Sequence, residues 1–417
     1  MSSLDELLNA RPTRQVWHEV CLLLAELDED RLAAVAPQVL SWPAQQRPMP
    51  DDWWDQWTTG DVRPHHSLAG VRHLGILRVA EDEHDEGEET GLDDAYFYHG
   101  ATAVAAPSDL SWVALGAAAE WHHNGGDIVR WNTIEKDQLT WLLEGADYHD
   151  EPHDMQLSPD GRTVVTSVEG RLHAWSAETG DELWTLPECS GTDNNDVLDD
   201  EDEDYVRIGF SGNGCRVAIG TCVSGRVAVM ETETGQVVLS VPVEQQAFGP
   251  VALDAEGQLL AHTSPEGRVV VREVDSGAVL VTIPTRLSRV NALAMAPDGT
   301  AVFTVGGMAD DAAPAAQLLK IGPSRAVGEL IRPTELPVEI DTNLSLAIFG
   351  TRAVWTDRGP YAFVTADKGS MLFDSTARTL WASPNHQIVS FTPDGRAMVT
   401  VDETIEAWFL TGLDIPE

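Results

Sequence analysis

One short phrase of sequence recurs along this chain and constrains its fold more than any other feature. Each copy is an alternating apolar run, a four-residue turn and a second alternating run, as in MQLSPDGRTVVTS (155–167), LAMAPDGTAVFTV (293–305) and VSFTPDGRAMVTV (389–401). Alternation with a period of two predicts a strand with one buried face, and Pro-Asp-Gly predicts a hairpin turn because glycine accepts a positive φ. The sequence therefore predicts a series of β-hairpins.

Weaker copies bring the number of repeats to seven. Aligning their turns gives residues spaced 42 to 53 positions apart, namely Asp109, Gly161, Gly214, Gly257, Gly299, Thr351 and Gly395. A third strand is expected after each hairpin, as at Gly170–Trp175, and then a fourth strand that ends at a proline such as Pro242. Proline suits an outermost strand, since no neighbour there needs its amide hydrogen. Four strands repeated about every 43 residues are typical of a propeller blade.

The repeats predict a mostly β protein, a seven-bladed β-propeller over residues 66–417. A single blade cannot bury both of its faces, so the blades are expected to close into a ring. The last copy supplies only three strands, and the run GVRHLGILRV at 70–79 is expected to supply the fourth. Pairing the two ends of the propeller in this way removes the open edges of the ring.

Residues 1–65 have a different character and predict a small helical segment. Five apolar residues recur at helical spacing, namely Val16, Val20, Leu23, Leu24 and Leu27. A second helical run begins at Asp30 and is expected to be interrupted at Pro37. We expect the two helices to pack against one side or face of the ring.

The helical segment ends in a tryptophan-rich stretch that supplies the interface candidates of this chain. These candidates are Trp42, Trp53, Trp54 and Trp57. Exposed tryptophans often anchor protein partners, because they bury a large apolar area and also donate a hydrogen bond. The alternative is that these rings fix the helices to the propeller.

The charge of the chain narrows the classes of partner. Lys and Arg number 26 against 68 Asp and Glu, so the net charge is −42. Such an acidic chain repels phosphate groups, which argues against nucleic acid and anionic membranes as partners. The acidity fits either a surface that keeps the protein soluble, including at high salt, or a surface that meets a basic ligand. Abundant arginine, alanine and glycine with few lysines favour a GC-rich, bacterial genome.

No feature of the sequence predicts export or a membrane span. The N-terminus lacks a basic region followed by an apolar run, and no window offers about 18 uninterrupted apolar residues. We therefore expect a cytoplasmic protein.

The sequence nominates no catalytic, cofactor or metal site. It contains no GxSxG turn, no HExxH and no phosphate-binding glycine-rich loop. Asp200, Asp202 and Asp204 alternate as calcium ligands do, but the glycine and the final glutamate of an EF-hand loop are missing. The strands predicted to line the central channel are mainly small and apolar, as in Val251-Ala-Leu and Val389-Ser-Phe. This pattern predicts a structural channel rather than an active site.

The repeats resemble the WD-repeat family over roughly residues 70–415. The resemblance lies in the Ser-Pro-Asp-Gly hairpin, in the tryptophan that closes the third strand, as at Trp175, and in the Thr-Gly turn that follows. The Gly-His and Trp-Asp signatures of that family are largely missing. The polar network that they form is therefore expected to be absent or replaced here.

One copy, LHAWSAETGDELW (172–184), is also similar to the tryptophan-docking repeat of quinoprotein propellers. Together these features favour a non-catalytic scaffold or adaptor that binds protein partners, rather than an enzyme. Two alternatives stay open. One is a propeller enzyme or small-molecule binder of the quinoprotein kind, and the other is a structural subunit of a larger complex that docks through its helical segment.

Overall fold

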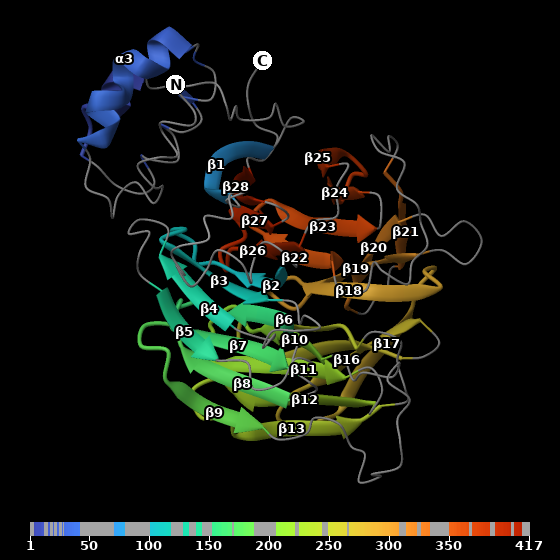
Figure 1. Cartoon of the computed structure of the whole chain (residues 1–417). Helices are drawn as coiled ribbons and strands as arrows, with labels where there is room; N and C mark the ends of the chain where they lie inside the picture. The colour runs from blue at the N-terminus through green and yellow to red at the C-terminus, as the bar shows by residue number, and fades with distance from the viewer. Residues whose placement is uncertain are drawn as a thin grey trace.

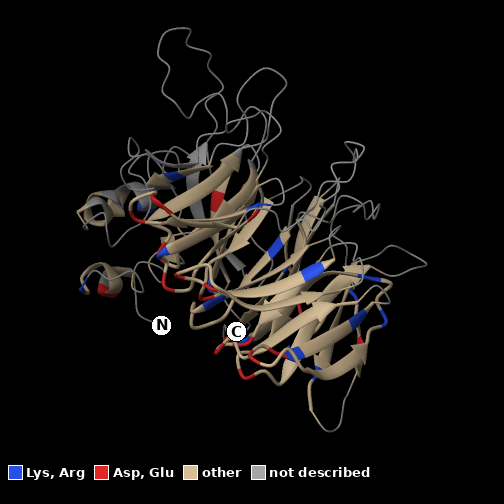
Figure 2. Ribbon diagram, turned by 90° about the horizontal axis from the view of Figure 1, so that it is seen from below, with Lys and Arg blue, Asp and Glu red and all other residues tan. Residues whose placement is uncertain are grey.

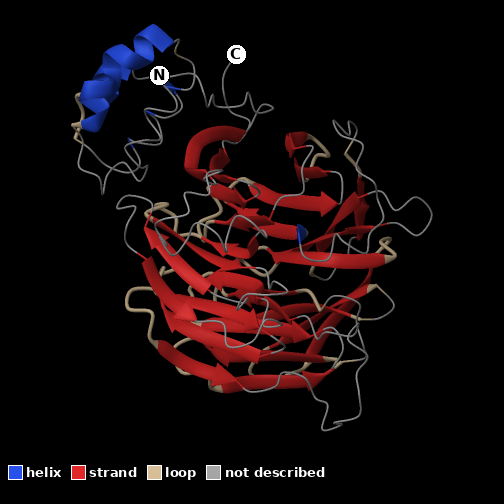
Figure 3. Cartoon of the chain, in the orientation of Figure 1, coloured by secondary structure: helices blue, strands red, loops and turns tan. Residues whose placement is uncertain are grey.

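Seven four-stranded antiparallel sheets make up the main body of this protein (Figure 1). The computed structural model describes residues 4–11, 16, 20, 23–24, 27, 29–41, 71–79, 101–117, 128–132, 139–143, 152–168, 171–186, 206–221, 225–243, 249–264, 267–307, 314–322, 327–333, 350–366, 369–383, 388–401 and 404–410. Strands dominate this part of the chain (Figure 3). The predicted fold, a mostly β seven-bladed propeller, is confirmed.

In the first four blades the strands follow sequence order from the innermost to the outermost. Blade 1 consists of β2 (Ala101–Ala105), β3 (Trp112–Ala117), β4 (Ile128–Asn132) and β5 (Leu139–Leu143). Blade 2 consists of β6 (Pro152–Leu157), β7 (Thr163–Val168), β8 (Arg171–Ser176) and β9 (Glu182–Leu186). Blade 3 consists of β10 (Val206–Phe210), β11 (Arg216–Thr221), β12 (Arg226–Glu231) and β13 (Val237–Pro242). Blade 4 consists of β14 (Val251–Leu253), β15 (Leu259–Thr263), β16 (Arg268–Glu273) and β17 (Val279–Pro284).

Blades 5 and 6 repeat this order, and blade 7 combines the two ends of the propeller. Blade 5 consists of β18 (Arg289–Met295), β19 (Ala301–Gly307), β20 (Pro314–Lys320) and β21 (Val327–Ile331). Blade 6 consists of β22 (Arg352–Thr356), β23 (Gly359–Ala366), β24 (Gly369–Asp374) and β25 (Thr379–Ser383). Blade 7 consists of β26 (Ile388–Phe391), β27 (Ala397–Val401), β28 (Thr404–Leu410) and, outermost, β1 (Val71–Val79).

The ring is closed both at its centre and through blade 7. Each innermost strand contacts the innermost strands of the two neighbouring blades, in a circuit that runs from β2 through β26 and back to β2. In blade 7, β1 pairs antiparallel with β28, from Val71 opposite Leu410 to Val79 opposite Thr404. The earliest described strand therefore completes the last blade as its outermost strand.

A polar residue opens most of the inner hairpins and accepts hydrogen bonds within the turn. The Oγ of Ser158 accepts from the amide of Thr163 at 2.9 Å, and the Oγ of Ser211 accepts from the amide of Arg216 at 3.0 Å. The predicted hairpin glycines have positive φ, for example +73° at Gly161. The repeated phrase is thus a turn motif whose first residue and glycine each have a defined physical role.

The turn residue predicted for the sixth repeat is wrong. Thr351 is buried and lies just before the innermost strand β22, while the hairpin turn of this blade lies at 357–358, between β22 and β23. The amide of Arg358 donates to the Oγ of Thr356, which opens this tighter turn. The apolar strand of this repeat was recognised correctly. Its turn was misplaced because the two-residue turn lacks the Pro-Asp-Gly signature.

Polar pairs link neighbouring strands inside several blades. The indole of Trp175 in β8 donates to Thr166 in β7 at 3.2 Å, and that of Trp408 in β28 donates to Thr400 in β27 at 2.9 Å. In blade 4 the corresponding pair is Arg272 and His262, whose Nε and Nε2 atoms are 3.0 Å apart. Each pair joins the second strand to the third strand of its blade.

The blade 2 and blade 3 sheets are joined by a docked tryptophan. The indole of Trp184 in the outermost strand β9 donates to the carbonyl of Thr232 at 2.8 Å, in the turn before β13. A Cβ atom placed on Gly235 of the same turn would lie 2.7 Å from the Trp184 ring. Glycine is therefore required at position 235, both for this close approach and for its φ of +67°.

The helical segment contains α1 (Leu4–Leu8) and α3 (Glu29–Leu40). Val20 and Leu24 are fully buried and belong to an apolar cluster that includes residues of blades 1 and 7, such as Val113 and Val399. The predicted interruption at Pro37 is wrong, because α3 continues through this residue to Leu40.

No helix in the described part of the chain is long and apolar enough to cross a bilayer. The division of the chain at residues 65 and 66 stays a prediction.

Candidate functional site

The central channel of the propeller contains a pocket of about 260 Å³. Its walls come from the innermost strands of six blades, β6, β10, β14, β18, β22 and β26, and from the segments next to them. This volume is just below the range of about 300–1,000 Å³ that is usual for ligand sites, so the pocket matches a small molecule.

Asp154 organises the polar part of the pocket. Its carboxylate is buried, and its Oδ1 accepts from the Arg352 guanidinium at 2.8 Å and from the amide of Met155 at 3.0 Å. Its Oδ2 accepts from the amide of Ile208, in the neighbouring blade, at 2.9 Å. The carboxylate thus joins blade 2 to blade 3 beside it and to blade 6 across the channel. Both of its oxygens therefore accept hydrogen bonds from the protein.

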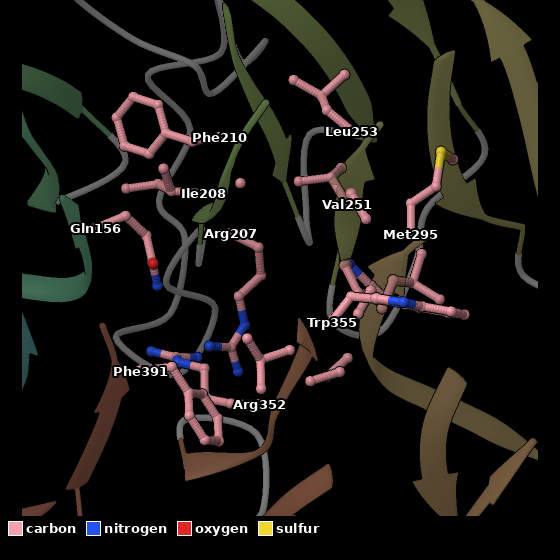
Figure 4. A pocket seen from close by; sticks show the side chains of 18 of the residues that line it. Gln156, Arg207, Ile208, Phe210, Val251, Leu253, Met295, Arg352, Trp355 and Phe391 are labelled. Atoms are coloured by element: carbon pink, nitrogen blue, oxygen red, sulfur yellow. The ribbon is translucent and has the colours of Figure 1, made fainter. Parts of the chain in front are cut away.

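Two arginines give this part of the pocket a positive balance. Arg207 from β10 and Arg352 from β22 both point into the pocket (Figure 4). Asp154 is the only acidic residue among the described lining residues, so their formal net charge is +1. In a chain with a net charge of −42, the described lining of this pocket has the opposite sign.

Asn291 adds a buried amide to the pocket. The residue is 2% exposed, and neither its Oδ1 nor its Nδ2 forms a hydrogen bond within the described part of the chain. The Nε of Arg352 is likewise buried without a partner among these residues. Burying an amide without hydrogen bonds costs roughly 1–3 kcal/mol, so such groups mark a position where another molecule supplies the missing bonds.

The other end of the same strands is apolar and aromatic. Arg207 and Arg352 occur at or near the start of their strands, whereas Phe210, Trp355 and Phe391 occur at or near the end of theirs and are half-buried. Val251, Leu253 and Met295 complete this apolar wall. A molecule in the pocket would therefore contact charged groups along one part of its length and apolar side chains along another.

The expectation of a mainly apolar, structural channel is thus wrong in its polar part. A signal for these residues was present in the sequence. Asp154, Arg207 and Arg352 each occur four positions before the residue that opens the hairpin, which is Ser158, Ser211 and Thr356 respectively. Because the turn of the sixth repeat was expected at Thr351, Arg352 was not aligned with Asp154 and Arg207 of the other repeats.

The remaining sequence-derived candidates are not brought together by the described structure. Trp42, Trp53, Trp54 and Trp57 lie outside the described residues, as do Asp200, Asp202 and Asp204. Among the residues that are described, no group of three or more His, Cys, Asp or Glu side chains is arranged to hold a metal ion.

A second surface feature lies on the outside of the ring. Five large apolar side chains of the described residues are exposed, and all of them belong to the outermost strands of four consecutive blades, β9, β13, β17 and β21. They are Leu183, Val237, Val279, Leu280 and Val327. We call these four strand edges the outer rim.

Acidic residues occupy many of the turns that join the strands, with basic residues interspersed (Figure 2).

Comparison with known proteins supports the fold and adds one family resemblance. The family model for "Outer membrane protein assembly factor BamB" matches residues 127–309, which is less than half of the chain. The matched region runs from β4 to β19 and includes the docked Trp184. No curated protein matches this chain.

Among solved structures, the chain is similar to one titled "Crystal Structure of Mitotic Checkpoint Complex". The TM-score is 0.54 at 15% sequence identity, with 76% of this chain and 89% of that chain covered. A likeness at this identity concerns the fold alone.

Proposed function

We propose that this propeller is a non-catalytic, cytoplasmic scaffold that binds an extended segment of a partner protein along its outer rim. The observation that carries the proposal is the composition of two neighbouring edge strands. The strands β13 (VVLSVP) and β17 (VLVTIP) contain no charged residue, and each is the outermost strand of its sheet. Exposed apolar edges of this kind present backbone groups that pair readily with another strand.

The exposed side chains on these edges make them unusual for a protein surface. Val279 and Leu280 are 49% and 51% exposed, and Val237 is 46% exposed. Proteins usually protect an edge strand with lysine, inward-pointing charge or proline, and here only the last residue of each strand is proline. An unprotected edge fits addition of a partner strand, which gains affinity from main-chain hydrogen bonds and specificity from alternate side chains.

The charges around β13 and β17 give the two edges the same polarity. Exposed acidic residues occur in the turn before each strand, Glu233 before β13 and Asp275 before β17. At the far end, Arg226 is opposite Pro242, and Arg268 is opposite Pro284. A complementary segment would carry basic residues at the end near the turns and acidic residues at the other end.

Affinity capture with the full chain as bait tests this proposal. The doubly substituted variant Val279→Lys with Leu280→Lys places charge on an exposed edge, where it opposes strand addition without disturbing the core. Gln258→Lys is the matched control, because Gln258 is exposed in the inner hairpin of the same blade. We expect a protein that the wild type and the control retain and that the rim variant loses. Retention by all three chains, or no retained protein at any salt concentration, contradicts the proposal.

The same capture addresses the alternative of a structural subunit that docks through its tryptophan-rich stretch. A variant with alanine at Trp53, Trp54 and Trp57 is expected to retain the partner if the outer rim binds it. Loss of the partner in this variant, with retention by the rim variant, favours docking through the tryptophans.

The polar pocket in the channel favours a second candidate function, a propeller that binds a small molecule. The resemblance of residues 172–184 to quinoprotein repeats agrees with this candidate. A ligand that binds only the folded chain must raise its melting temperature. A thermal-shift screen against metals, cofactors and small organic acids therefore tests the candidate, and the absence of any concentration-dependent shift opposes it.

A further inference from the structure

We propose that the channel pocket binds a small hydroxylated organic acid, with its carboxylate and hydroxyl groups against the polar part and its apolar tail along the aromatic wall. This inference rests on the second candidate function and is independent of the protein scaffold. Each part of the proposed ligand follows from a different set of lining residues.

The carboxylate is assigned by the charge of the pocket. Arg207 and Arg352 supply two guanidinium groups, and the one described acidic side chain, Asp154, is already engaged by Arg352 and two backbone amides. The Nε of Arg352 is buried and has no hydrogen-bond partner among the described residues, so it can donate to a bound carboxylate. Guanidinium groups also match the planar geometry of a carboxylate.

The hydroxyl group is assigned by Asn291. Its Nδ2 requires an acceptor, and its Oδ1 requires a donor, since neither atom has a partner among the described residues. A carboxylate alone supplies acceptors but no donor. A hydroxyl group next to the carboxylate supplies both, so a hydroxy acid satisfies Asn291 more fully than a simple carboxylic acid does.

The apolar tail is assigned by the opposite part of the pocket. Val251, Leu253 and Met295 line it together with the half-buried rings of Phe210 and Trp355 (Figure 4). The volume of about 260 Å³ limits the ligand to a few carbon atoms beyond its polar group.

Isothermal titration calorimetry of the full chain with four probes tests each assignment separately. The probes are 2-hydroxyhexanoate, hexanoate without the hydroxyl group, 1,2-hexanediol without the charge, and inorganic phosphate without the tail. We expect saturable binding of one 2-hydroxyhexanoate per chain, about tenfold tighter than hexanoate because one buried hydrogen bond is lost in the latter. The diol and phosphate are expected to bind more weakly still.

The acidic surface simplifies the interpretation of this titration. At a net charge of −42 the chain repels anions from its surface, so saturable binding of a single anion reports a local cationic site. Failure of 2-hydroxyhexanoate to bind, or equal binding of the diol, overturns the proposal. Neither result bears on capture of a partner by the outer rim, so failure of this inference and failure of the scaffold proposal are distinguishable.

Substitution of Asn291 tests the hydroxyl assignment in particular. In Asn291→Leu the preference for 2-hydroxyhexanoate over hexanoate should disappear, whereas Arg162→Gln should keep it because this side chain is 85% exposed on the surface. An unchanged preference in the Asn291 variant overturns the assignment. Asn291→Ser serves as a second variant if the first does not fold, and the comparison of probes on the wild type needs no variant.

Discussion

Arg352 and Asp154 are 198 positions apart in sequence, and they form an ion pair of 2.8 Å across the central channel of the ring. Their blades, 6 and 2, are not neighbours, so this contact joins opposite parts of the propeller directly. The side chains are 14% and 2% exposed respectively. The pair therefore depends on closure of all seven blades, and it also shapes the polar part of the pocket.

Asp154→Asn is predicted to destabilise the protein strongly. Removing one partner of a buried pair leaves an uncompensated charge, which typically costs about 3–5 kcal/mol in the free energy of unfolding. The control is Asp275→Asn, in which one of the two acidic partners of Arg216 is lost at a site that is 71% exposed, and about 1 kcal/mol or less is expected there. Chemical denaturation measures both values, and equal effects would show that the cross-channel pair is not important for stability.

Replacing both residues of this pair is expected to restore stability rather than reduce it. Asp154→Leu combined with Arg352→Met removes both charges, so most of the stability lost in Asp154→Asn should return. A double variant as unstable as the single one would instead place the role of Asp154 in its bonds to the amides of Met155 and Ile208.

Two glycines with the same backbone conformation are predicted to differ in their tolerance of alanine. Gly161 and Gly235 have φ values of +73° and +67°, so alanine causes similar backbone strain at both, about 1–2 kcal/mol. A Cβ atom at Gly161 meets nothing within 4 Å, whereas one at Gly235 overlaps the docked ring of Trp184. Thermal unfolding should show a clearly larger loss for Gly235→Ala, and similar losses at both positions would contradict the docked arrangement.

His262 is predicted to make stability fall in mild acid. Burial, together with the nearby Arg272 cation, lowers the pKa of His262 from 6.5 to about 4. Above pH 6.5 the side chain is neutral in both states. As the pH falls towards 4, the unfolded chain takes up a proton that the folded chain excludes, so stability is lost in this window.

The size of this effect is measurable against a neutral variant. Between pH 7.5 and pH 5.0 the wild type should lose about 2 kcal/mol more than His262→Gln, because each unit of pKa difference corresponds to about 1.4 kcal/mol. Glutamine keeps an acceptor for the Nε of Arg272. Denaturation curves at the two pH values provide the comparison, and parallel losses in both chains would show that His262 does not titrate as proposed.

The fold was predictable because the repeated turn and strand patterns each require a particular backbone conformation. The glycines at 161, 214, 257, 299 and 395 all have positive φ, as Pro-Asp-Gly and its variants predict. The run at 70–79 was expected to complete the last blade because the final repeat lacks a strand, and β1 pairs there with β28. Blade 6 was misaligned because its two-residue turn, Asp357-Arg358, is shorter than the four-residue turns of the other repeats.

The pocket was less predictable because its residues meet only through ring closure. Asp154, Arg207 and Arg352 belong to three blades, and nothing in the spacing of one blade shows which residues of another face it. The charge-free composition of β13 and β17 was visible in the sequence, and the proline that ends each strand predicted its outermost position. The exposure of their side chains was not predicted, since an apolar run of that length equally predicts a buried strand.

Hydrogen exchange of the protein with and without its captured partner tests the outer rim most directly. If a partner strand adds to the rim, backbone amides of β13 and β17 should become strongly protected in the complex, while those of the innermost strands stay unchanged. Protection confined to other parts of the chain, with unchanged exchange in β13 and β17, would contradict the account.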